Sequence, residues 1–313
     1  MGYETNVSSG HDSKQAFALP LVSVILFVRN LVAYVETAVL SVLRQSSEGV
    51  EFLVFDGGST DGTVQVLQKY RDRFSYFVSA SDGGPAAVIN EGVRRASGEI
   101  IILLAGDDWL EPGALQGIAS EFKNDGELDV LCCGVRIATL GRDGKPERER
   151  VYATSEALEF TLASIVRTPL THGRILRKRV YLKIGTYDET IRYTHDLDFL
   201  IRCAIAGVRW KVHPSIAYTY CRHSGSRTLS GTHTDIARNS LDNLQIARRY
   251  LRRTGLDQAE VSALLDLHAR AAARCVQSAL YDVNSSVLWP LVKDAFRTDS
   301  LWPVRAAIQL ATR

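Results

Sequence analysis

Short apolar segments alternate with amphipathic segments through the first 125 residues, and this alternation constrains the fold more than any other feature. The pattern predicts strands at residues 22–28, 51–55 and 76–79, and a strand buried on both faces at 100–104. Helical patterns lie between them, at roughly 31–44, after the turn at 56–62, and at 85–96. Strands that alternate with helices predict an α/β fold with a parallel sheet.

The second half of the chain departs from this regular alternation. A predicted helix at 113–122 precedes a run at 129–138, which together with the segment at 141–150 suggests a hairpin-like strand with a charged, exposed excursion. The charged run itself is interpreted as a solvated loop. A last strand is predicted at 215–221, and the pattern beyond residue 232 is helical to the end. We therefore expect a flexible leader at 1–18, a catalytic domain at 19–230 and a C-terminal helical region at 231–313.

Composition excludes several classes of protein. The 313 residues are 46% hydrophobic and 23% charged, which is ordinary for a globular chain. The net charge of +2 gives no field that would attract nucleic acid. Five cysteines without CxxC spacing argue against a disulfide framework or a structural zinc site, and favour a reducing cytoplasm. The longest uncharged stretch near the N-terminus contains Pro20 and is too short to span a bilayer.

Acidic residues follow the predicted strands at the edge where an open parallel sheet binds its ligands. Asp56 precedes two glycines, which let a ligand approach the backbone closely. Asp82 follows the third strand, and Asp107 and Asp108 follow the most hydrophobic one. Such adjacent carboxylates suit Mg²⁺ or Mn²⁺ that bridges a diphosphate, although they would also suit the N-cap of the next helix.

Several motifs together resemble the inverting family 2 glycosyltransferases. They read PLVSVILFVRN at 20–30, SVLRQS at 41–46, EFLVFDGGSTDGT at 51–63, SDGG at 81–84 and INEGVRRASGEIIILLAGDDWLEPGAL at 89–115. The likeness continues less tightly through THGRILRKRVYLKIGTYDE at 171–189, HDLDFLIR at 195–202 and YCRHSGS at 220–226. It implies an A-type glycosyltransferase fold, which is Rossmann-like with a mostly parallel central sheet flanked by helices, here followed by a C-terminal helical extension.

The resemblance also implies a nucleotide-diphospho-sugar donor, bound by the half at 19–125. Asp56 matches the aspartate that contacts the base, and Asp82 an acidic position near the nucleotide. The expected donor site is completed by Val28, Gly57, Asp107 and Asp108. Asp107 matches the metal-binding carboxylate, and the expected ligands of Mn²⁺ or Mg²⁺ are Asp107, Asp108 and His223. A lone histidine such as His223 is also common as a surface residue.

The half at 126–230 is expected to bind the acceptor and to hold the catalytic base. Asp196 matches the family's catalytic aspartate and precedes a predicted helix, whereas Asp198 would lie inside that helix and pair with Arg202. His172 and Gly173 match a loop that shapes the acceptor pocket. His195 replaces the usual glutamate before the base, where it would orient the base or touch the acceptor; an exposed loop histidine is the alternative.

Three positions depart from the family pattern and keep a second interpretation open. Ala105 and Ala87 stand where carboxylates are common, and Gly57 where many members have aspartate. The alternative is therefore a catalytically degenerate domain that binds sugar nucleotides or other partners. A nucleotidyltransferase is a third class, but SVILFVRN at 23–30 lacks its glycine- and basic-rich phosphate loop.

The expected acceptor is a glycan or lipid-linked glycan in bacterial surface polysaccharide or glycolipid synthesis. Aromatic and basic residues alternate in the tail, which contains Trp289, Lys293, Arg297, Trp302 and Arg305. This pattern permits peripheral contact with the inner face of the cytoplasmic membrane, while plain helix packing or a homo-oligomer interface is the alternative.

Overall fold

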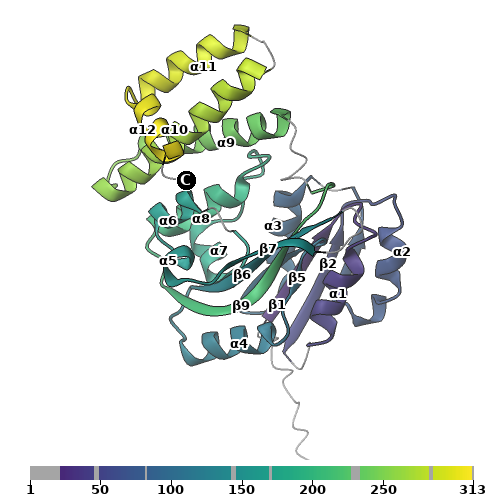
Figure 1. The fold of residues 1–313 in the computed structure, drawn as a ribbon. Helices are drawn as coiled ribbons and strands as arrows, with labels where there is room; N and C mark the ends of the chain where they lie inside the picture. Colours follow the sequence, from purple (N-terminus) through teal and green to yellow (C-terminus); the bar gives the residue numbers. More distant parts are fainter. Residues whose placement is uncertain are drawn as a thin grey trace, which may run out of the picture.

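One mixed sheet forms the centre of the molecule (Figure 1). The computed structural model describes residues 22–45, 49–81, 83–141, 146–168, 171–226, 233–281 and 285–311. The strands of this part run in the order β3-β2-β1-β4-β8-β6-β9-β5, and β7 pairs with β6 outside that order. They are β1 (Val22–Val28), β2 (Val50–Asp56), β3 (Tyr76–Ser79), β4 (Ile100–Ala105), β5 (Trp109–Leu110), β6 (Val130–Leu140), β7 (Pro146–Tyr152), β8 (Arg174–Arg177) and β9 (Trp210–Arg222).

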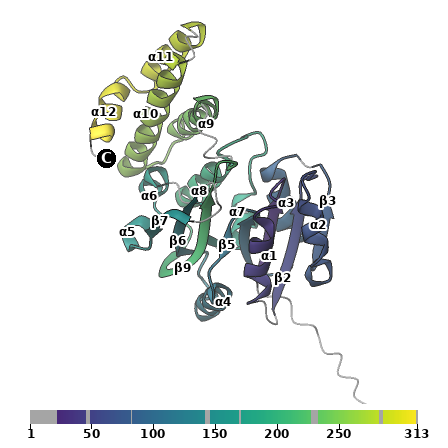
Figure 2. The same ribbon diagram turned by 45° about the vertical axis from the view of Figure 1, so that its right-hand side comes forward.

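Helices cover both faces of this sheet and continue beyond it at one end, where α9 to α12 gather (Figures 1 and 2). The helices are α1 (Val35–Leu43), α2 (Thr63–Gln68), α3 (Pro85–Arg95), α4 (Ala114–Asn124), α5 (Ser155–Leu158), α6 (Leu162–Arg167), α7 (Lys178–Ile184), α8 (His195–Ile205), α9 (His233–Leu251), α10 (Gln258–Tyr281), α11 (Ser285–Thr298) and α12 (Trp302–Ala311). Regular alternation thus holds up to α4, as the sequence predicts.

The first four strands form the parallel half of the sheet. β1 lies between β2 and β4, and all three run parallel. Because side chains alternate between the faces of a strand, Val24 and Leu26 pack in the core that includes α1 and α4. Ile25 packs in the opposite core, with α3 and α8. Burial on both faces explains why these strands are continuous apolar runs.

The second half of the sheet mixes directions. β8 runs antiparallel to β4 and β6, whereas β6 and β9 are parallel. The prediction of a solvated loop at 141–150 is wrong for residues 146–150, because these residues belong to β7, which pairs with β6 as a hairpin. Its charged side chains from 147 to 150 stay exposed while the backbone forms the ladder. β9 also begins earlier than predicted, since its first residues pair with β6.

The C-terminal helices belong to two different cores. Ile246 and Tyr250 of α9 and Leu264 of α10 share one apolar core with Leu197 and Leu200 of α8. A separate small core, which includes Ala295 and Trp302, joins α10 to α11 and α12. Within the described residues, no helix is long and apolar enough to cross a membrane. The first C-terminal helix, α9, therefore packs beside the helix that begins at His195, and α10 packs on α9 and α6.

Replacement of Gly92 by alanine tests the packing of α3 against β1. A Cβ at Gly92 would lie 2.5 Å from Cγ2 of Ile25, whose side chain is fully buried. We expect Gly92→Ala to lower the free energy of unfolding by about 1–3 kcal/mol, although alanine favours helix formation. Gly117→Ala in α4 is the control, because its nearest atom is 3.8 Å away, and it should stabilise by about 0.5–1 kcal/mol. Urea denaturation measures both, and a stable Gly92→Ala variant would contradict the packing.

Candidate active site

The ends of β2 and β4 place Asp56 and Asp107 on opposite sides of Val28. Val28 is level with Asp56 in the β1–β2 ladder, and the Gly57 amide donates to the Val28 carbonyl at 2.9 Å. On the other side, the Gly106 amide donates to the Phe27 carbonyl at 3.0 Å. A Cβ at Gly106 would lie 2.5 Å from Val28 Cγ2, so only glycine lets β4 end this close to β1.

The Asp56 carboxylate organises the turn that follows β2. It accepts hydrogen bonds from the amides of Gly58 and Ser59 at 3.1 and 3.0 Å, and from the hydroxyls of Ser59 and Ser79. A cavity of about 210 Å³ lies beside it, lined by residues that include Val78, Ala87 and Glu91. Asp56 thus forms one wall of a hollow at the carboxyl edge of the sheet. Asp82 lies outside the described residues.

Asp108 is buried and ties β4 to β9. Its Oδ2 accepts from the Tyr218 hydroxyl at 2.7 Å, and its Oδ1 from the Cys221 amide at 2.8 Å. Burial raises the pKa of Asp108 well above its usual value, and the charge of Asp107 raises it further. The alternative that this pair caps the next helix is wrong, because the N-cap of α4 is Gly113. The sequence analysis did not identify Tyr218 as a partner of Asp108.

Asp107 faces His223, which follows β9. Oδ2 of Asp107 lies 3.2 Å from Nε2 of His223. The Gly225 amide donates to Nδ1 at 3.2 Å, so the neutral ring carries its proton on Nε2 and donates it to Asp107. Tyr34, another residue that sequence reasoning missed, stacks on His223 with ring centres 4.0 Å apart. His223 is therefore a buried partner of Asp107, in contrast to the surface alternative.

His172 lies on the other side of Asp108. Its ring stacks on Tyr220 at 4.4 Å, and Nε2 is 3.7 Å from Asp108 Oδ2. Burial and the nearby charge of Arg222 lower the pKa of His172 to about 4, although Asp196 opposes them, so the ring is neutral at pH 7. Because the charge of Asp196 acts on the pKa of His172, the two side chains lie in the same region.

Gly173 and Arg222 complete this side of the site. Gly173 has φ +74°, and a Cβ there would lie 2.9 Å from the Cys133 carbonyl, so close backbone packing accounts for the glycine. The Arg222 guanidinium lies over the Tyr220 ring, and its buried Nε has no hydrogen-bond partner among the described residues. Arg222 thus keeps one unsatisfied buried donor on this side of the site.

Asp196 lies in the first turn of α8, one step inside the helix that was predicted to follow it. Within the described part of the chain, its carboxylate accepts one hydrogen bond, from the Leu197 amide at 2.8 Å. His195 is buried against Tyr187, with ring centres 5.5 Å apart, and is not an exposed loop residue. Asp198 is buried and accepts from Arg202 Nε at 3.0 Å, as expected for a structural pair.

Comparison with known proteins defines the family. The model of glycosyl transferase family 2 matches residues 23–185, just over half of the chain, and the chain therefore belongs to this family. An uncharacterized glycosyltransferase of Rickettsia typhi is 29% identical over 192 residues, which are 59% of this chain and 59% of that protein. Chondroitin synthase of Pasteurella multocida is 25% identical over 272 residues, 80% of this chain but 28% of the synthase. The chain thus aligns with less than two thirds of either relative.

Solved structures show the fold. The structure of S. aureus TarS 1–349 in complex with UDP-GlcNAc matches with a TM-score of 0.67 and 21% identity, over 91% of this chain and 86% of that one. A mannosyltransferase of Pyrobaculum calidifontis in complex with GDP-Man and Mn²⁺ matches with a TM-score of 0.58 and 16% identity, over 93% and 87%. These likenesses confirm the expected A-type glycosyltransferase fold with its C-terminal helices.

Removal of the Tyr218 hydroxyl tests whether Asp108 holds β4 to β9. Tyr218→Phe leaves a buried carboxylate without one of its donors, which we expect to cost about 1–3 kcal/mol of stability. Tyr76→Phe is the control, because the Tyr76 ring packs beside Arg95 and its hydroxyl has no recorded hydrogen bond in the described residues. Chemical denaturation measures both; equal effects would contradict the role of the Tyr218 contact.

Proposed function

We propose that the chain transfers a sugar from a nucleotide-diphospho-sugar to an acceptor hydroxyl, with inversion at the anomeric carbon and with a divalent metal ion. The observation that carries this proposal is the position of Asp107. It lies at the end of β4, beside His223 and across Val28 from Asp56. A donor along this edge would place its nucleotide near Asp56 and its diphosphate near Asp107.

The residues at this edge fit a metal ion. Asp107 and Asp108 are adjacent carboxylates in a largely buried position, and in the part of the chain that the structure describes neither forms an ion pair with lysine or arginine. Burial raises the pKa of Asp107, which a cation would oppose. No described group of three or more acidic, histidine or cysteine side chains could hold a metal alone. Diphosphate oxygens would therefore supply further ligands, as is usual for Mg²⁺.

Asp107 is the direct ligand that the geometry supports best. Both Asp108 oxygens already accept hydrogen bonds inside the protein, so this carboxylate would hold the end of β4 in place and would not bind the metal itself. His223 donates to Asp107 through Nε2 and would orient it. This differs from the expectation that all three residues bind Mn²⁺ or Mg²⁺. When bound, the metal would neutralise charge on the leaving diphosphate.

The protein's own residues would perform the remaining steps. The Asp196 carboxylate has acceptor capacity beyond its single bond to the Leu197 amide, and it would take the proton of the attacking hydroxyl. Neutral His172 would bind the acceptor or the sugar by hydrogen bonding, and the Arg222 guanidinium would contact the diphosphate. Gly173 and His195 would define the shape of the acceptor pocket and would not bind the substrate directly, because both are packed against neighbouring residues.

The comparisons support a sugar nucleotide as donor and a glycan as acceptor. TarS and the mannosyltransferase were solved with UDP-GlcNAc and GDP-Man, and chondroitin synthase is a polysaccharide synthase by name. We therefore infer a role in bacterial surface polysaccharide or glycolipid synthesis at the cytoplasmic face of the membrane. A degenerate binding domain is the second candidate, because Ala87 lines the cavity beside Asp56 at a position where the family resemblance implies aspartate.

Two single substitutions separate donor binding from transfer. Thermal unfolding with UDP-GlcNAc or GDP-mannose, with and without Mn²⁺, should show stabilisation that requires the metal, because a ligand of the native state raises its stability. Asp107→Asn should abolish the shift. Asp196→Asn should keep the shift but lower donor turnover by about 10²- to 10⁴-fold, the usual contribution of a general base.

Asp72→Asn, on an exposed turn away from the sheet edge, is the control and should behave like the wild type. Full turnover by Asp196→Asn would contradict its role as base. Metal-dependent binding without turnover by the wild type would favour the degenerate domain.

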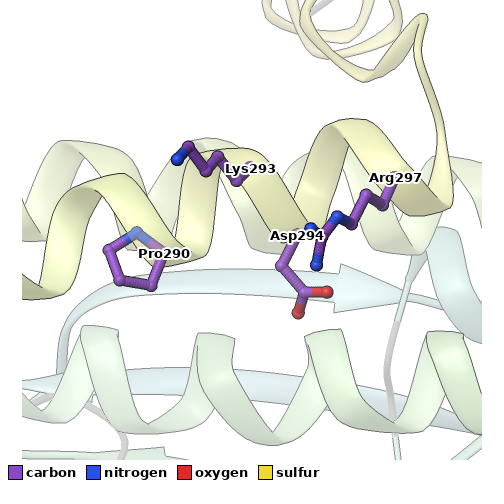
Figure 3. A pocket seen from close by; sticks show the side chains of 4 residues that line it. All are labelled: Pro290, Lys293, Asp294 and Arg297. Atoms are coloured by element: carbon purple, nitrogen blue, oxygen red, sulfur yellow. The ribbon is translucent and has the colours of Figure 1, made fainter.

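The outer face of α11 and α12 supports peripheral membrane contact. Phe296, Leu301 and Val304 are 45%, 56% and 56% exposed, although they are large and apolar. Lys293 and Arg297 lie on α11 in the same stretch of helix as Phe296 (Figure 3). Asp294 lies between them in sequence and pairs with Arg248 of α9. Exposed apolar side chains among cations match an interface with anionic lipids. We propose that this face rests on the membrane where the acceptor is presented.

Charge reversal on α11 tests this contact. The double variant Lys293→Glu, Arg297→Glu should lose co-sedimentation with phosphatidylglycerol-containing vesicles, because each cation near an anionic surface contributes about 1 kcal/mol. The matched control reverses Lys69 and Arg71, two exposed cations at the other end of the molecule. Binding that survives the first reversal, or that is equally strong to neutral phosphatidylcholine, would contradict the proposal.

A further inference from the structure

The first turn of α8 is held by a side chain from α9. Thr194 is the N-cap residue of α8, but its side chain makes no capping hydrogen bond. Instead, Oδ2 of Asp242 accepts hydrogen bonds from the amides of Tyr193 at 2.8 Å and Thr194 at 3.3 Å. A carboxylate at this end satisfies free amides and also interacts favourably with the helix dipole. Asp242 thus acts as a cap supplied from a distant part of the chain.

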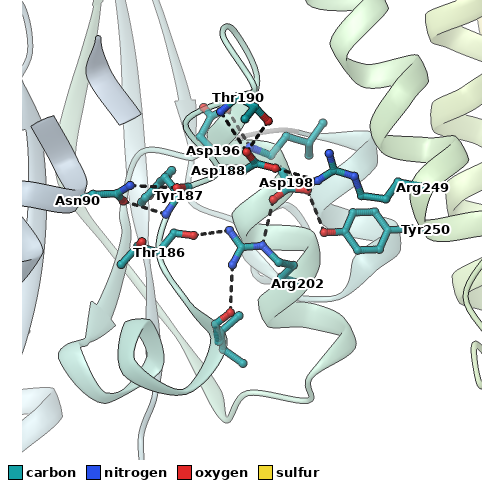
Figure 4. A network of polar contacts seen from close by, with 12 residues as sticks. Asn90, Thr186, Tyr187, Asp188, Thr190, Asp196, Asp198, Arg202, Arg249 and Tyr250 are labelled. Atoms are coloured by element: carbon teal, nitrogen blue, oxygen red, sulfur yellow. Dashed lines mark hydrogen bonds and ion pairs between the residues drawn. The ribbon is translucent and has the colours of Figure 1, made fainter. Parts of the chain in front are cut away.

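A second contact joins the two helices one turn farther on. Asp198 is buried, and its Oδ1 accepts from the Tyr250 hydroxyl at 2.9 Å and from Arg249 at 3.4 Å (Figure 4). Its Oδ2 accepts from Arg202 of its own helix. Because buried charged groups interact strongly with their hydrogen-bond partners, this network resists displacement of α8 relative to α9.

The same network fixes the turn at 185–190, which lies beside α8. Arg249 also reaches Asp188 at 3.0 Å, and Arg202 donates to the carbonyls of Ile184 and Thr186 (Figure 4). Asn90 of α3 holds the Tyr187 backbone from the other side, at 2.9 and 3.0 Å. α8 and the turn beside it are therefore clamped between α3 and α9.

Asp196 depends on this clamp because its own side chain is held weakly. Its one described hydrogen bond comes from the next amide of the same helix, so the position of its carboxylate follows the backbone of the first turn. We propose that Asp242 is a positioning residue for Asp196, so that α9 is a working part of the transfer site. This inference rests on the role of Asp196 proposed above.

Kinetics of three variants in the full chain test this inference. The assay is release of UDP from UDP-GlcNAc, or of GDP from GDP-mannose, in the presence of Mn²⁺. Asp242→Ala should lower kcat about 10- to 100-fold with the KM for the donor within about twofold, since misplacement of a reacting group by about 1 Å has such an effect. Asp242→Asn keeps an acceptor oxygen and should restore most of kcat.

Asp257→Ala is the matched control. Asp257 accepts from the Glu260 amide at 2.8 Å at the start of α10, so its loss removes a comparable cap at a different helix. Both alanine variants should lose similar thermal stability, but only Asp242→Ala should lose kcat. Tyr250→Phe keeps the ring in the core and removes only the hydrogen bond to Asp198. Like Asp242→Ala, it should lower kcat, and it should do so without unfolding the chain.

Equal kcat values for Asp242→Ala, Asp257→Ala and the wild type would overturn the inference while the proposed function stands. If Asp196→Asn itself keeps full turnover, the base assignment fails, and the positioning role fails with it. A loss of kcat in Asp242→Ala that Asp242→Asn does not recover would also count against the cap, because the asparagine oxygen can still accept.

Discussion

The buried carboxylate of Asp108 connects the two halves of the sheet at the point where the site forms. It accepts from Tyr218 and from the Cys221 backbone, both in β9, although these residues are more than a hundred positions away in sequence. This connection brings the end of β9 to the end of β4, and so places His223 against Asp107. Burial of a carboxylate costs free energy unless the group is hydrogen-bonded. Two donors satisfy Asp108, and together with the adjacent β5–β9 ladder they favour a single arrangement of β4 and β9.

The parallel register of β2, β1 and β4 is the second constraint. It sets Asp56 and Asp107 on the two sides of Val28, at the carboxyl edge where α/β sheets bind ligands. The catalytic aspartate that we propose does not come from this edge, since it lies in the first turn of α8, next to the amides that Asp242 of α9 holds. The site therefore combines a rigid donor platform with a base whose position depends on helices outside the parallel half.

Local pattern predicted the parallel half well, because each strand there is buried and each helix is amphipathic over a short range. β1 has the predicted bounds, and the pairing of Asp198 with Arg202 follows from helical spacing alone. The roles of Tyr34, Tyr218 and Asp242 escaped prediction, because their partners are distant in sequence. The end of β9 brings partners to Tyr34 and Tyr218, and the packing of α9 beside α8 brings them to Asp242. The charged run of β7 was interpreted as the loop of a hairpin-like element for another reason: its residues lack an apolar pattern, and its stability as a strand comes from backbone pairing with β6.

The most direct test of this account is a crystal structure of the protein with Mn²⁺ and the donor that stabilises it, with anomalous scattering measured at the manganese edge. The account predicts one strong peak within coordination distance of an Asp107 oxygen and of the donor diphosphate, with the nucleotide in the cavity beside Asp56. It also predicts that no coordination bond reaches Asp108. A manganese peak away from Asp107, or a donor bound at this edge without metal, would contradict the central claim.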